Sequence, residues 1–341
     1  MHDRRALDPA LHADAAPQLD LRGATVAVTG GAGFIGSHLV DALVARGARV
    51  RVLDDLSTGR DANLDAARAM TAAADDPGRL TIHVASLLDR DACAALCDGA
   101  RYVWHQAALG SVPRSLRDPA ATVLANVAGT TNLLTAARDA GATRVVYASS
   151  SSVFGDSDRL PKVEGEEGRV LSPYALSKRM NEDLADVFGR CFDLGMIGLR
   201  YFNVYGPRQR PDGPYAAVIP RFVAAQRAGD APTIHGDGAQ SRDFTFVADA
   251  VRANLLAMAA PADACGRAYN VGAGDRTTVV DLAAAIRDAL GGPSATHGPP
   301  RPGDVRHSLA DLTASGRALG YAPRFALAEG LRRTLTAEVP A

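Results

Sequence analysis

A tyrosine and a lysine stand four residues apart in the segment SPYALSK, at Tyr174 and Lys178. Residues at i and i+4 share one face of a helix, so the two side chains can act together. A tyrosine with a pKa of roughly 10 is a weak base at neutral pH, and a neighbouring ammonium group favours its phenolate form. Upstream, four serines occupy residues 149–152, and we expect Ser150 to hydrogen-bond a reacting hydroxyl group. The three residues suit proton transfer to and from an alcohol.

A glycine-rich turn lies near the amino end, where Gly30, Gly33 and Gly36 occupy the segment GGAGFIG. Residues 24–29 predict a buried strand before the turn, and apolar residues at helical spacing follow it. Glycines let the backbone approach a pyrophosphate, and the amino end of the helix offers N–H groups to its phosphates. Asp54, at the end of a second predicted strand, can accept from both ribose hydroxyls of NAD and would repel the 2′-phosphate of NADP. The sequence therefore predicts a site for NAD.

The elements that must position these residues alternate along the chain. Further strands are predicted at 49–53, 80–84, 102–104, 145–148, 196–200 and 268–271, and helices at 122–140, 172–191 and 279–290. This alternation predicts an α/β fold: a Rossmann-type doubly wound parallel sheet with a smaller mixed α/β lobe. We assign residues 1–20 to a mobile N-terminal extension, 21–203 with 244–290 to the NAD-binding domain, and 204–243 with 291–341 to the lobe that binds the substrate.

Composition excludes several classes of function. The formal net charge of −1 and the 22% of charged residues predict no nucleic acid or membrane partner. The four cysteines form no CxxC pair and no HExxH motif occurs, so we predict no metal. No apolar signal region begins the sequence, and we expect a cytoplasmic protein with reduced thiols. Lysine occurs only at positions 162 and 178, which makes Lys178 more conspicuous.

Several segments together resemble the extended short-chain dehydrogenases/reductases that act on nucleotide sugars. They are GGAGFIG at 30–36, the serine run before VFGD at 153–156, SPYALSK at 172–178 and LRYFNVYGPRQ at 199–209. HQAALGSVPRSLRDP at 105–119 and GDVRHSLAD at 303–311 are similar to the UDP-N-acetylglucosamine 4-epimerase branch, and 214–222 and 237–247 fit that branch apart from Pro214. The resemblance covers the chain from about residue 22 to its end and is specific rather than a likeness of fold alone.

The resemblance implies roles residue by residue. Ser150, Tyr174 and Lys178 match the catalytic positions. The residues that match cofactor contacts are Gly30, Gly33, Phe34, Ile35, Gly36, Asp54, Ser86, Leu87, Ala107, Tyr174, Lys178 and Tyr201. The residues that match substrate contacts are Ser111, Ser150, Ser151, Tyr174, Asn203, Val218, Arg242, Arg301 and Ser308. Ser86 is a departure, because many relatives place an aspartate there to contact adenine.

The resemblance also implies the reaction: a UDP-sugar 4-epimerase that works through a 4-keto intermediate with transient reduction of NAD. A bulky residue at position 308 would restrict the site to UDP-glucose and UDP-galactose, whereas Ser308 leaves room for an N-acetyl group. We therefore expect interconversion of UDP-N-acetylglucosamine and UDP-N-acetylgalactosamine. UDP-glucose is a further expected substrate, since a roomy pocket discriminates weakly against a smaller group.

The sequence leaves several alternative functions open. A 4,6-dehydratase or a decarboxylase is disfavoured, because such relatives carry a carboxylate where Ser151 and Ser152 stand. A UDP-N-acetylhexosaminuronate 4-epimerase would use an arginine such as Arg114 to pair with the substrate carboxylate. A non-catalytic NAD-sensing protein is disfavoured, because the chain keeps Ser150, Tyr174 and Lys178 together. We also expect a homodimer through a four-helix bundle, with an apolar seam at Leu176, Met180, Leu184 and Val187.

Overall fold

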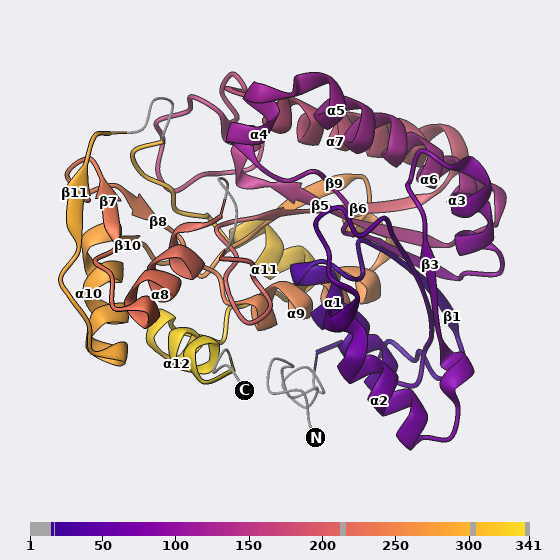
Figure 1. The fold of residues 1–341 in the computed structure, drawn as a ribbon. Coiled ribbons are helices and arrows are strands. Elements are labelled where there is room, and N and C mark those ends of the chain that lie inside the picture. Colours follow the sequence, from indigo (N-terminus) through magenta and orange to yellow (C-terminus); the bar gives the residue numbers. More distant parts are fainter. Residues whose placement is uncertain (1–14, 17, 212–215, 301–304, 338–341) are drawn as a thin grey trace.

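The computed structural model describes residues 15–16, 18–211, 216–300 and 305–337 (Figure 1). At its centre lies a sheet of seven parallel strands in the order β3-β2-β1-β4-β5-β6-β9. The strands are β1 Thr25–Thr29, β2 Arg49–Asp54, β3 Leu80–Val84, β4 Tyr102–His105, β5 Arg144–Ser150, β6 Gly195–Tyr201 and β9 Arg267–Val271. The prediction of a Rossmann-type doubly wound parallel sheet is confirmed.

Helices cover both faces of the sheet (Figure 1). One layer contains α1 Phe34–Ala45, α2 Asp65–Ala73, α9 Val247–Ala259 and α11 Thr313–Leu319; the other contains α3 Arg90–Cys97, α4 Val112–Arg117, α5 Pro119–Val123, α6 Gly129–Asp139 and α7 Pro173–Phe192. Successive strand residues face opposite layers. In β1, Val26 and Val28 belong to the core with α1 and α9, whereas Ala27 belongs to the core with α3 and α6.

Helix α7 carries the tyrosine and the lysine of the SPYALSK segment. It begins after Ser172, whose hydroxyl accepts from Ala175 N at 3.1 Å, with Pro173 in the first turn. It ends at Asp193, which adopts a left-handed conformation with φ of 53°. The serine cap and the proline are the signals expected at a helix start. The predicted range 172–191 agrees with the observed helix to within one residue.

The predicted helix 122–140 is present, and a π-helical turn interrupts its α-helical hydrogen bonding. A π-helical turn at Leu124–Ala128 separates α5 from α6, and the buried Asn126 lies within it. A Cβ atom at Gly129 would lie 2.9 Å from Leu87 Cβ, so α6 packs closely where the turn ends. A π turn holds one residue more than an α turn and therefore shifts the side chains beyond it around the helix axis. The alanine-rich segment carries no strong apolar stripe in which such a shift would show.

The lobe has its own apolar core beside the sheet domain (Figure 1). It contains α8 Val218–Ala228, α10 Val279–Leu290 and α12 Leu327–Ala337, with the short strands β7 Thr233–His235, β8 Ser241–Arg242, β10 Thr277–Thr278 and β11 Thr296–Gly298. β10 pairs with β8 in antiparallel fashion, and β11 pairs with β7 in parallel.

The structure corrects three of the predicted domain assignments. Helix α10, which we expected to rejoin the sheet, packs on α8 and α12 in the lobe. Residues 313–321, assigned to the lobe, pack on α9 and β9. Ala15, Ala16 and Leu19, assigned to a mobile extension, are buried in the core of the sheet domain, while residues 1–14 and 17 lie outside the described residues. Helical spacing identifies an apolar face but not its partner, which explains the error for α10. Ala15, Ala16 and Leu19 follow no periodic pattern, so nothing in the sequence indicated their burial.

The strand order reverses between β1 and β4, because β2 and β3 lie on one side of β1 and the remaining strands on the other. In open α/β sheets this reversal opens a crevice at the carboxyl ends of the strands. The glycine turn follows β1, Asp54 is the last residue of β2, and the serine run begins in the last residues of β5. The topology therefore brings them to one edge of the sheet.

Candidate active site

A groove of about 590 Å³ runs along this edge of the sheet. All twelve residues predicted to contact the cofactor line it: Gly30, Gly33, Phe34, Ile35, Gly36, Asp54, Ser86, Leu87, Ala107, Tyr174, Lys178 and Tyr201. The glycine turn and Asp54 come from β1, β2 and α1, whereas Tyr174 and Lys178 come from α7. The groove thus joins the dinucleotide motif to the tyrosine and the lysine.

The glycine turn admits no side chain at two of its positions. Gly30 has φ of +68°, and a Cβ atom there would lie 2.6 Å from Ala107 N. A Cβ atom at Gly36 would lie 2.1 Å from Gly30 O. No side chain caps the amino end of α1 at Gly33, so the first N–H groups of the helix remain available to a ligand. This cradle of backbone suits a pyrophosphate.

Asp54 closes the groove beside the glycine turn. Its carboxylate accepts from Ala32 N and Leu56 N, each at 2.9 Å. Burial raises the pKa of Asp54, and the backbone hydrogen bonds from Leu56, Ala32 and Gly33 oppose that rise. A carboxylate has about four acceptor sites, so capacity for ribose hydroxyls remains. The residues present therefore fit the adenosine ribose of NAD.

Ser150, Tyr174 and Lys178 meet where β5 ends against α7. Ser150 hydrogen-bonds the Tyr174 hydroxyl, and Lys178 Nζ donates to Ala148 O at 2.7 Å. Nζ lies 6.0 Å from the centroid of the Tyr174 ring. Burial lowers the pKa of Lys178 to about 8, while the charge of Glu182 opposes that shift. Burial also raises the pKa of Tyr174, against the Ser150 hydrogen bond, so the lowering expected from the Lys178 spacing is absent.

Gln106 and Asn254, which the sequence analysis did not single out, hold Tyr201 in its place in the groove. Tyr201 Oη donates to Gln106 Oε1 at 3.2 Å and accepts from Asn254 Nδ2 at 2.6 Å, and Gln106 Nε2 donates to Asn254 Oδ1 at 3.0 Å. Burial raises the pKa of Tyr201 to about 12, so this second tyrosine stays a neutral phenol. The closed set of three hydrogen bonds leaves Tyr174 as the groove tyrosine suited to act as a base.

Asn126 in the π-helical turn connects two walls of the groove. Its amide oxygen accepts from Leu109 N at 2.7 Å, and its amide nitrogen donates to Ser177 Oγ at 3.0 Å. Ser177 in turn donates to Tyr174 O at 2.8 Å. Asn126 therefore helps to hold the amino-terminal turn of α7 against the loop after β4. An asparagine inside an alanine-rich helical segment gave no signal of this role.

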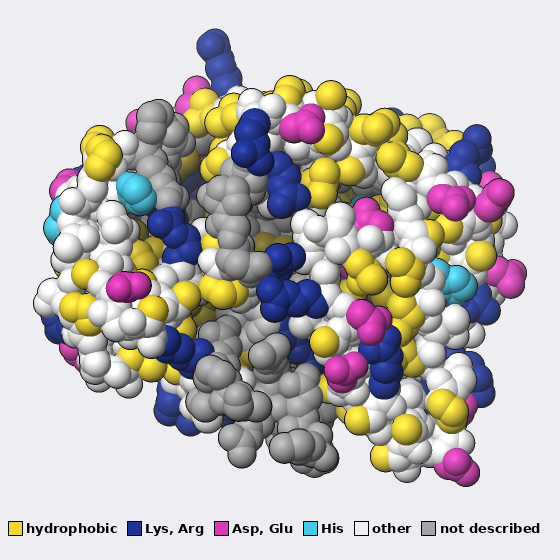
Figure 2. Space-filling model, in the orientation of Figure 1, with side chains coloured by type: hydrophobic (Ala, Val, Ile, Leu, Met, Phe, Trp, Pro, Cys, Tyr) yellow, Lys and Arg dark blue, Asp and Glu magenta, His cyan; other side chains and the backbone are white. Residues whose placement is uncertain are grey.

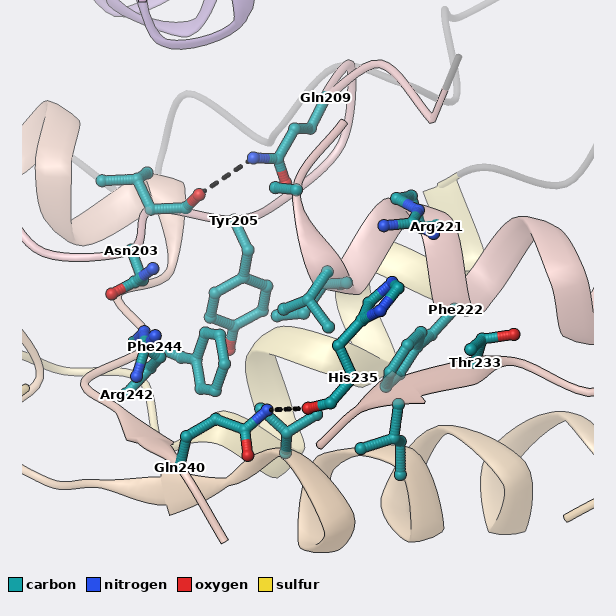
Figure 3. A pocket seen from close by; sticks show the side chains of 16 residues that line it. Asn203, Tyr205, Gln209, Arg221, Phe222, Thr233, His235, Gln240, Arg242 and Phe244 are labelled. Carbon is teal, nitrogen blue, oxygen red and sulfur yellow. Dashed lines mark hydrogen bonds between the residues drawn. The ribbon is translucent and has the colours of Figure 1, made fainter. Parts of the chain in front are cut away.

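A second cavity of about 200 Å³ lies in the lobe (Figure 3). Three of the predicted substrate residues, Asn203, Val218 and Arg242, line it. In Figure 3, Arg221 and Arg242 stand at opposite sides of the cavity with the rings of Tyr205 and Phe244 between them. Gln240 donates to His235 O at 2.8 Å, and Gln209 donates to Val204 O at 3.1 Å. Aromatic walls and arginine side chains suit a nucleotide with its diphosphate.

The remaining predicted substrate residues lie elsewhere on the described chain. Ser111 caps α4 by accepting from Arg114 N at 3.2 Å, and Ser151 begins the 3-10 turn that follows β5. Ser308 is buried, and its N–H donates to Ser241 O at 3.1 Å, directly beside Arg242. Arg301 lies outside the described residues. Over the described residues, neither cavity lining includes Ser111, Ser150, Ser151 or Ser308; Ser150 reaches the groove only through its hydrogen bond with Tyr174.

Comparison with known proteins now decides the family. Residues 26–272 match the NAD dependent epimerase/dehydratase family. The chain belongs to this family. A similar protein is the UDP-glucose 4-epimerase of Mycolicibacterium smegmatis. It is 40% identical over 311 residues, which cover 90% of this chain and 96% of that protein. The prediction of NAD as the cofactor is confirmed by membership of this NAD-dependent family.

Two solved structures of the epimerase/dehydratase type resemble the whole chain. The UDP-N-acetylglucosamine 4-epimerase of Methanobrevibacter ruminantium, in complex with UDP-N-acetylmuramic acid, has a TM-score of 0.84 and 36% identity, covering 93% of this chain and 98% of its own. The UDP-glucose 4-epimerase of Thermus thermophilus, in complex with NAD, has a TM-score of 0.80 and 34% identity, covering 92% of this chain and 98% of its own. The relatives of this family member therefore include epimerases for both hexose and N-acetylhexosamine substrates.

Within the ranges that the structure describes, no group of three or more His, Cys, Asp and Glu side chains could hold a metal ion. No helix in the same ranges combines the length and the apolar content that a bilayer crossing requires.

Proposed function

We propose that this chain is a UDP-hexose 4-epimerase that interconverts UDP-N-acetylglucosamine and UDP-N-acetylgalactosamine. The observation that carries the proposal is that Tyr174 and Lys178 line the groove that suits NAD and that Ser150 hydrogen-bonds Tyr174. Ser151 and Ser152 stand where dehydrating or decarboxylating relatives carry a carboxylate, which favours an epimerase within the family. The similarity to two 4-epimerases over more than nine-tenths of their lengths adds support.

The protein's own contribution to the chemistry is control of a proton. Tyr174 as phenolate takes the proton of the sugar's 4-hydroxyl, and Ser150 orients that hydroxyl. Lys178 keeps a positive charge beside the phenolate and so favours it. Bound NAD supplies the acceptor for the hydride of carbon 4 and, through its positive nicotinamide, further favours the phenolate. Once the 4-keto sugar has turned, the hydride would return to the other face of carbon 4, which inverts the centre, and Tyr174 gives the proton back to the 4-oxygen.

The lobe's task in this scheme is to hold the nucleotide while the sugar turns. Arg242, Asn203 and Val218 line a cavity separate from the groove, so the UDP part stays anchored there. Arginine binds phosphate oxygens in pairs because its guanidinium is planar. A 4-keto sugar attached to a fixed diphosphate can rotate about that link and offer its other face to the groove. The separation of the two cavities supports this division.

Ser308 supports the choice of an N-acetylated sugar. It lies in the segment that connects Arg242's strand to the loop around Lys162, since Ser308 N binds Ser241 O and Lys162 N binds Leu309 O. This segment therefore runs between the lobe cavity and the 157–164 loop that follows the serine run. A small side chain here leaves volume for the sugar's 2-substituent. UDP-glucose stays a second expected substrate, because a spare volume excludes a smaller group only weakly.

We also propose that the active species is a homodimer. Leu176, Met180 and Val187 of α7 are exposed, and Leu124 on the neighbouring π-helical turn is 53% exposed. Figure 2 shows apolar side chains along the upper edge, over α5 and α7. Leu184, the fourth residue of the predicted seam, packs partly into the chain's own core. An exposed apolar strip on two adjacent helices suits pairing with a second copy, and a monomer in light scattering at micromolar concentration would contradict it.

Proton NMR of the anomeric region tests the proposed reaction. The purified protein is incubated with UDP-N-acetylglucosamine or UDP-glucose, without added NAD. We expect UDP-N-acetylgalactosamine to appear, because NAD is regenerated in each turnover and need not be supplied. Failure with both sugars, in protein shown to hold NAD, would sink the proposal and turn attention to uronic acid substrates.

Ser308→Tyr sharpens the choice of sugar in the same assay. The added ring removes volume near the 2-substituent, so UDP-N-acetylglucosamine turnover should fall by roughly 100-fold while UDP-glucose turnover changes less than about threefold. Ser308→Ala is the matched control, since it keeps the volume and should convert both sugars. Equal loss on both sugars with Ser308→Tyr would mean that position 308 does not border the 2-substituent.

A further inference from the structure

Helix α7 binds the end of β5 at three successive strand residues. The contacts are Lys178 Nζ to Ala148 O at 2.7 Å, Ser149 Oγ to Glu182 Oε1 at 2.5 Å, and the hydrogen bond between Ser150 and Tyr174. The helix residues 174, 178 and 182 are spaced by four, so they form a single row on one face. Two members of the row belong to the catalytic trio of the proposed function. Glu182 is the third and does not belong to the groove lining.

The carboxylate of Glu182 is nine-tenths buried and fully engaged. Arg200 on β6 donates to it twice, from Nε to Oε1 and from Nη2 to Oε2, each at 2.8 Å. Arg200 also pairs with the buried Glu167, which lies 3.5 Å from Arg179. The charges alternate from Lys178 through Glu182, Arg200 and Glu167 to Arg179. A buried, paired carboxylate of this kind is costly to desolvate and is not needed for packing alone.

We propose that Glu182 is a positioning residue for proton transfer at Tyr174. It holds Ser149 between the strand residues that bind Lys178 and Tyr174, and its charge keeps Lys178 in the ammonium form despite burial. The proposal rests on the proposed function for its catalytic consequence. Its electrostatic part concerns Lys178 alone and holds for any substrate.

The direction of the effect follows from the charges around Lys178. Burial lowers the pKa of Lys178, and Glu182 opposes that shift. The other groups nearby are Tyr174 on the same helix and His105 from β4; burial lowers the pKa of His105 to about 3, so His105 is uncharged. Replacing Glu182 by glutamine leaves Arg200 without its main partner and makes the site more positive. Lys178 and Tyr174 then both lose their protons at lower pH.

The composition of the chain allows a direct measurement. Lysine occurs only at 162 and 178, so lysine labelled with ¹³C at the ε carbon gives two side-chain signals, and Lys162→Arg assigns them. We titrate the full-length, NAD-loaded protein and its Glu182→Gln variant by NMR. The titration midpoint of Lys178 should fall by at least about half a pH unit in Glu182→Gln. An unchanged midpoint overturns the proposal.

Asp186→Asn is the matched control, because Asp186 lies one turn further along α7, exposed, and pairs with Arg190 at 2.7 Å. It should leave the Lys178 midpoint within about 0.2 pH units of the wild-type value, since solvent screens exposed charges. Arg200→Gln tests the same charges in the opposite direction, because it removes a positive charge where Glu182→Gln removes a negative one. It frees Glu182 from its main partner, so the Lys178 midpoint should rise. If Glu182→Gln fails to fold, an absent rise in Arg200→Gln overturns the proposal instead.

Kinetics test the catalytic consequence. In Glu182→Gln, kcat at neutral pH should fall by roughly 10-fold or more, with KM for the UDP-sugar within about threefold and NAD content unchanged. Both limbs of the kcat–pH profile should move to lower pH. Ser149→Ala should lower kcat several-fold without moving the profile, because it removes the contact and keeps the charge; a wild-type kcat there overturns the positioning role. If the wild type converts no UDP-sugar, the proposed function fails, whereas the Lys178 titration still decides the role of Glu182.

Discussion

The groove and the lobe cavity recognise their ligands by different means. Gly, Ala, Ser and Thr make up about half of the groove lining, and added Cβ atoms at Gly30 and Gly36 would collide with neighbouring backbone. The lobe cavity is lined by large side chains such as Tyr205, Phe222 and Arg242. Amino-acid substitutions leave backbone N–H and C=O groups in place, so they change the ligand preference of a backbone site only with difficulty. They change the preference of a site made of side chains directly. The difference suits a cofactor common to the family and a substrate that differs among its members.

The largest expected effect is on the groove. Gly36→Ala places a Cβ atom 2.1 Å from Gly30 O and must displace the turn that receives the pyrophosphate. The purified variant should hold no NAD, and its turnover should fall by at least about 1,000-fold. Gly189→Ala on α7 is the control, since its Cβ would meet nothing closer than Leu194 O at 3.5 Å. NAD is measured by chromatography after denaturation, and a normal content in Gly36→Ala would break the comparison.

The next effect separates chemistry from cofactor binding within the groove. Tyr174→Phe removes the proton acceptor and leaves the ring that lines the groove. We expect kcat to fall by roughly 1,000-fold with NAD content unchanged. Tyr102→Phe, on β4 away from the groove lining, should keep wild-type kcat. Retention of a tenth of the activity by Tyr174→Phe would contradict the role of Tyr174 as base.

The smallest effect should come from the lobe cavity and should appear in KM. Arg242→Gln removes a guanidinium proposed to bind the diphosphate, so KM should rise by roughly 10- to 100-fold. NAD content should stay normal, because Arg242 lines the lobe cavity and not the groove. Arg306→Gln is the control, since Arg306 is exposed and pairs with Asp237 at 2.7 Å. Loss of NAD from Arg242→Gln would show that the two regions are not separable.

The same contrast explains what the sequence could predict. Most of the cofactor residues belong to short motifs at the ends of strands, and the strand and helix on either side of such a motif can be recognised in the sequence. All twelve of them line the groove. The lobe cavity draws on segments far apart in the chain, from Asn203 to Val279. Helical spacing placed an apolar face on α10 but assigned it to the wrong partner. The substrate positions therefore depended on resemblance alone, and one of them, Arg301, lies outside the described residues.

Buried polar contacts were the least predictable features. Glu182 and Asn126 lie within predicted helices, Asn254 lies in α9, which the sequence analysis did not predict, and the partners of all three come from other elements. A single polar residue among apolar neighbours gives the same sequence signal whether it faces solvent or a buried partner. Only the packing of α7 and α9 against the sheet brings these partners together. Such residues emerge from tertiary structure and not from spacing.

The chain leaves the sheet domain for the lobe at the carboxyl end of β6, and returns to it for α9 before leaving again for α10. Neither the sheet domain nor the lobe is therefore a continuous stretch of sequence that recombination could exchange as a unit. In such an architecture, point changes and loop insertions at the carboxyl ends of the strands alter the lobe while the sheet stays the same. New sugar specificities can then arise without disturbing the strands that align Tyr174 and Lys178, which accounts for relatives with different substrates and one common scaffold.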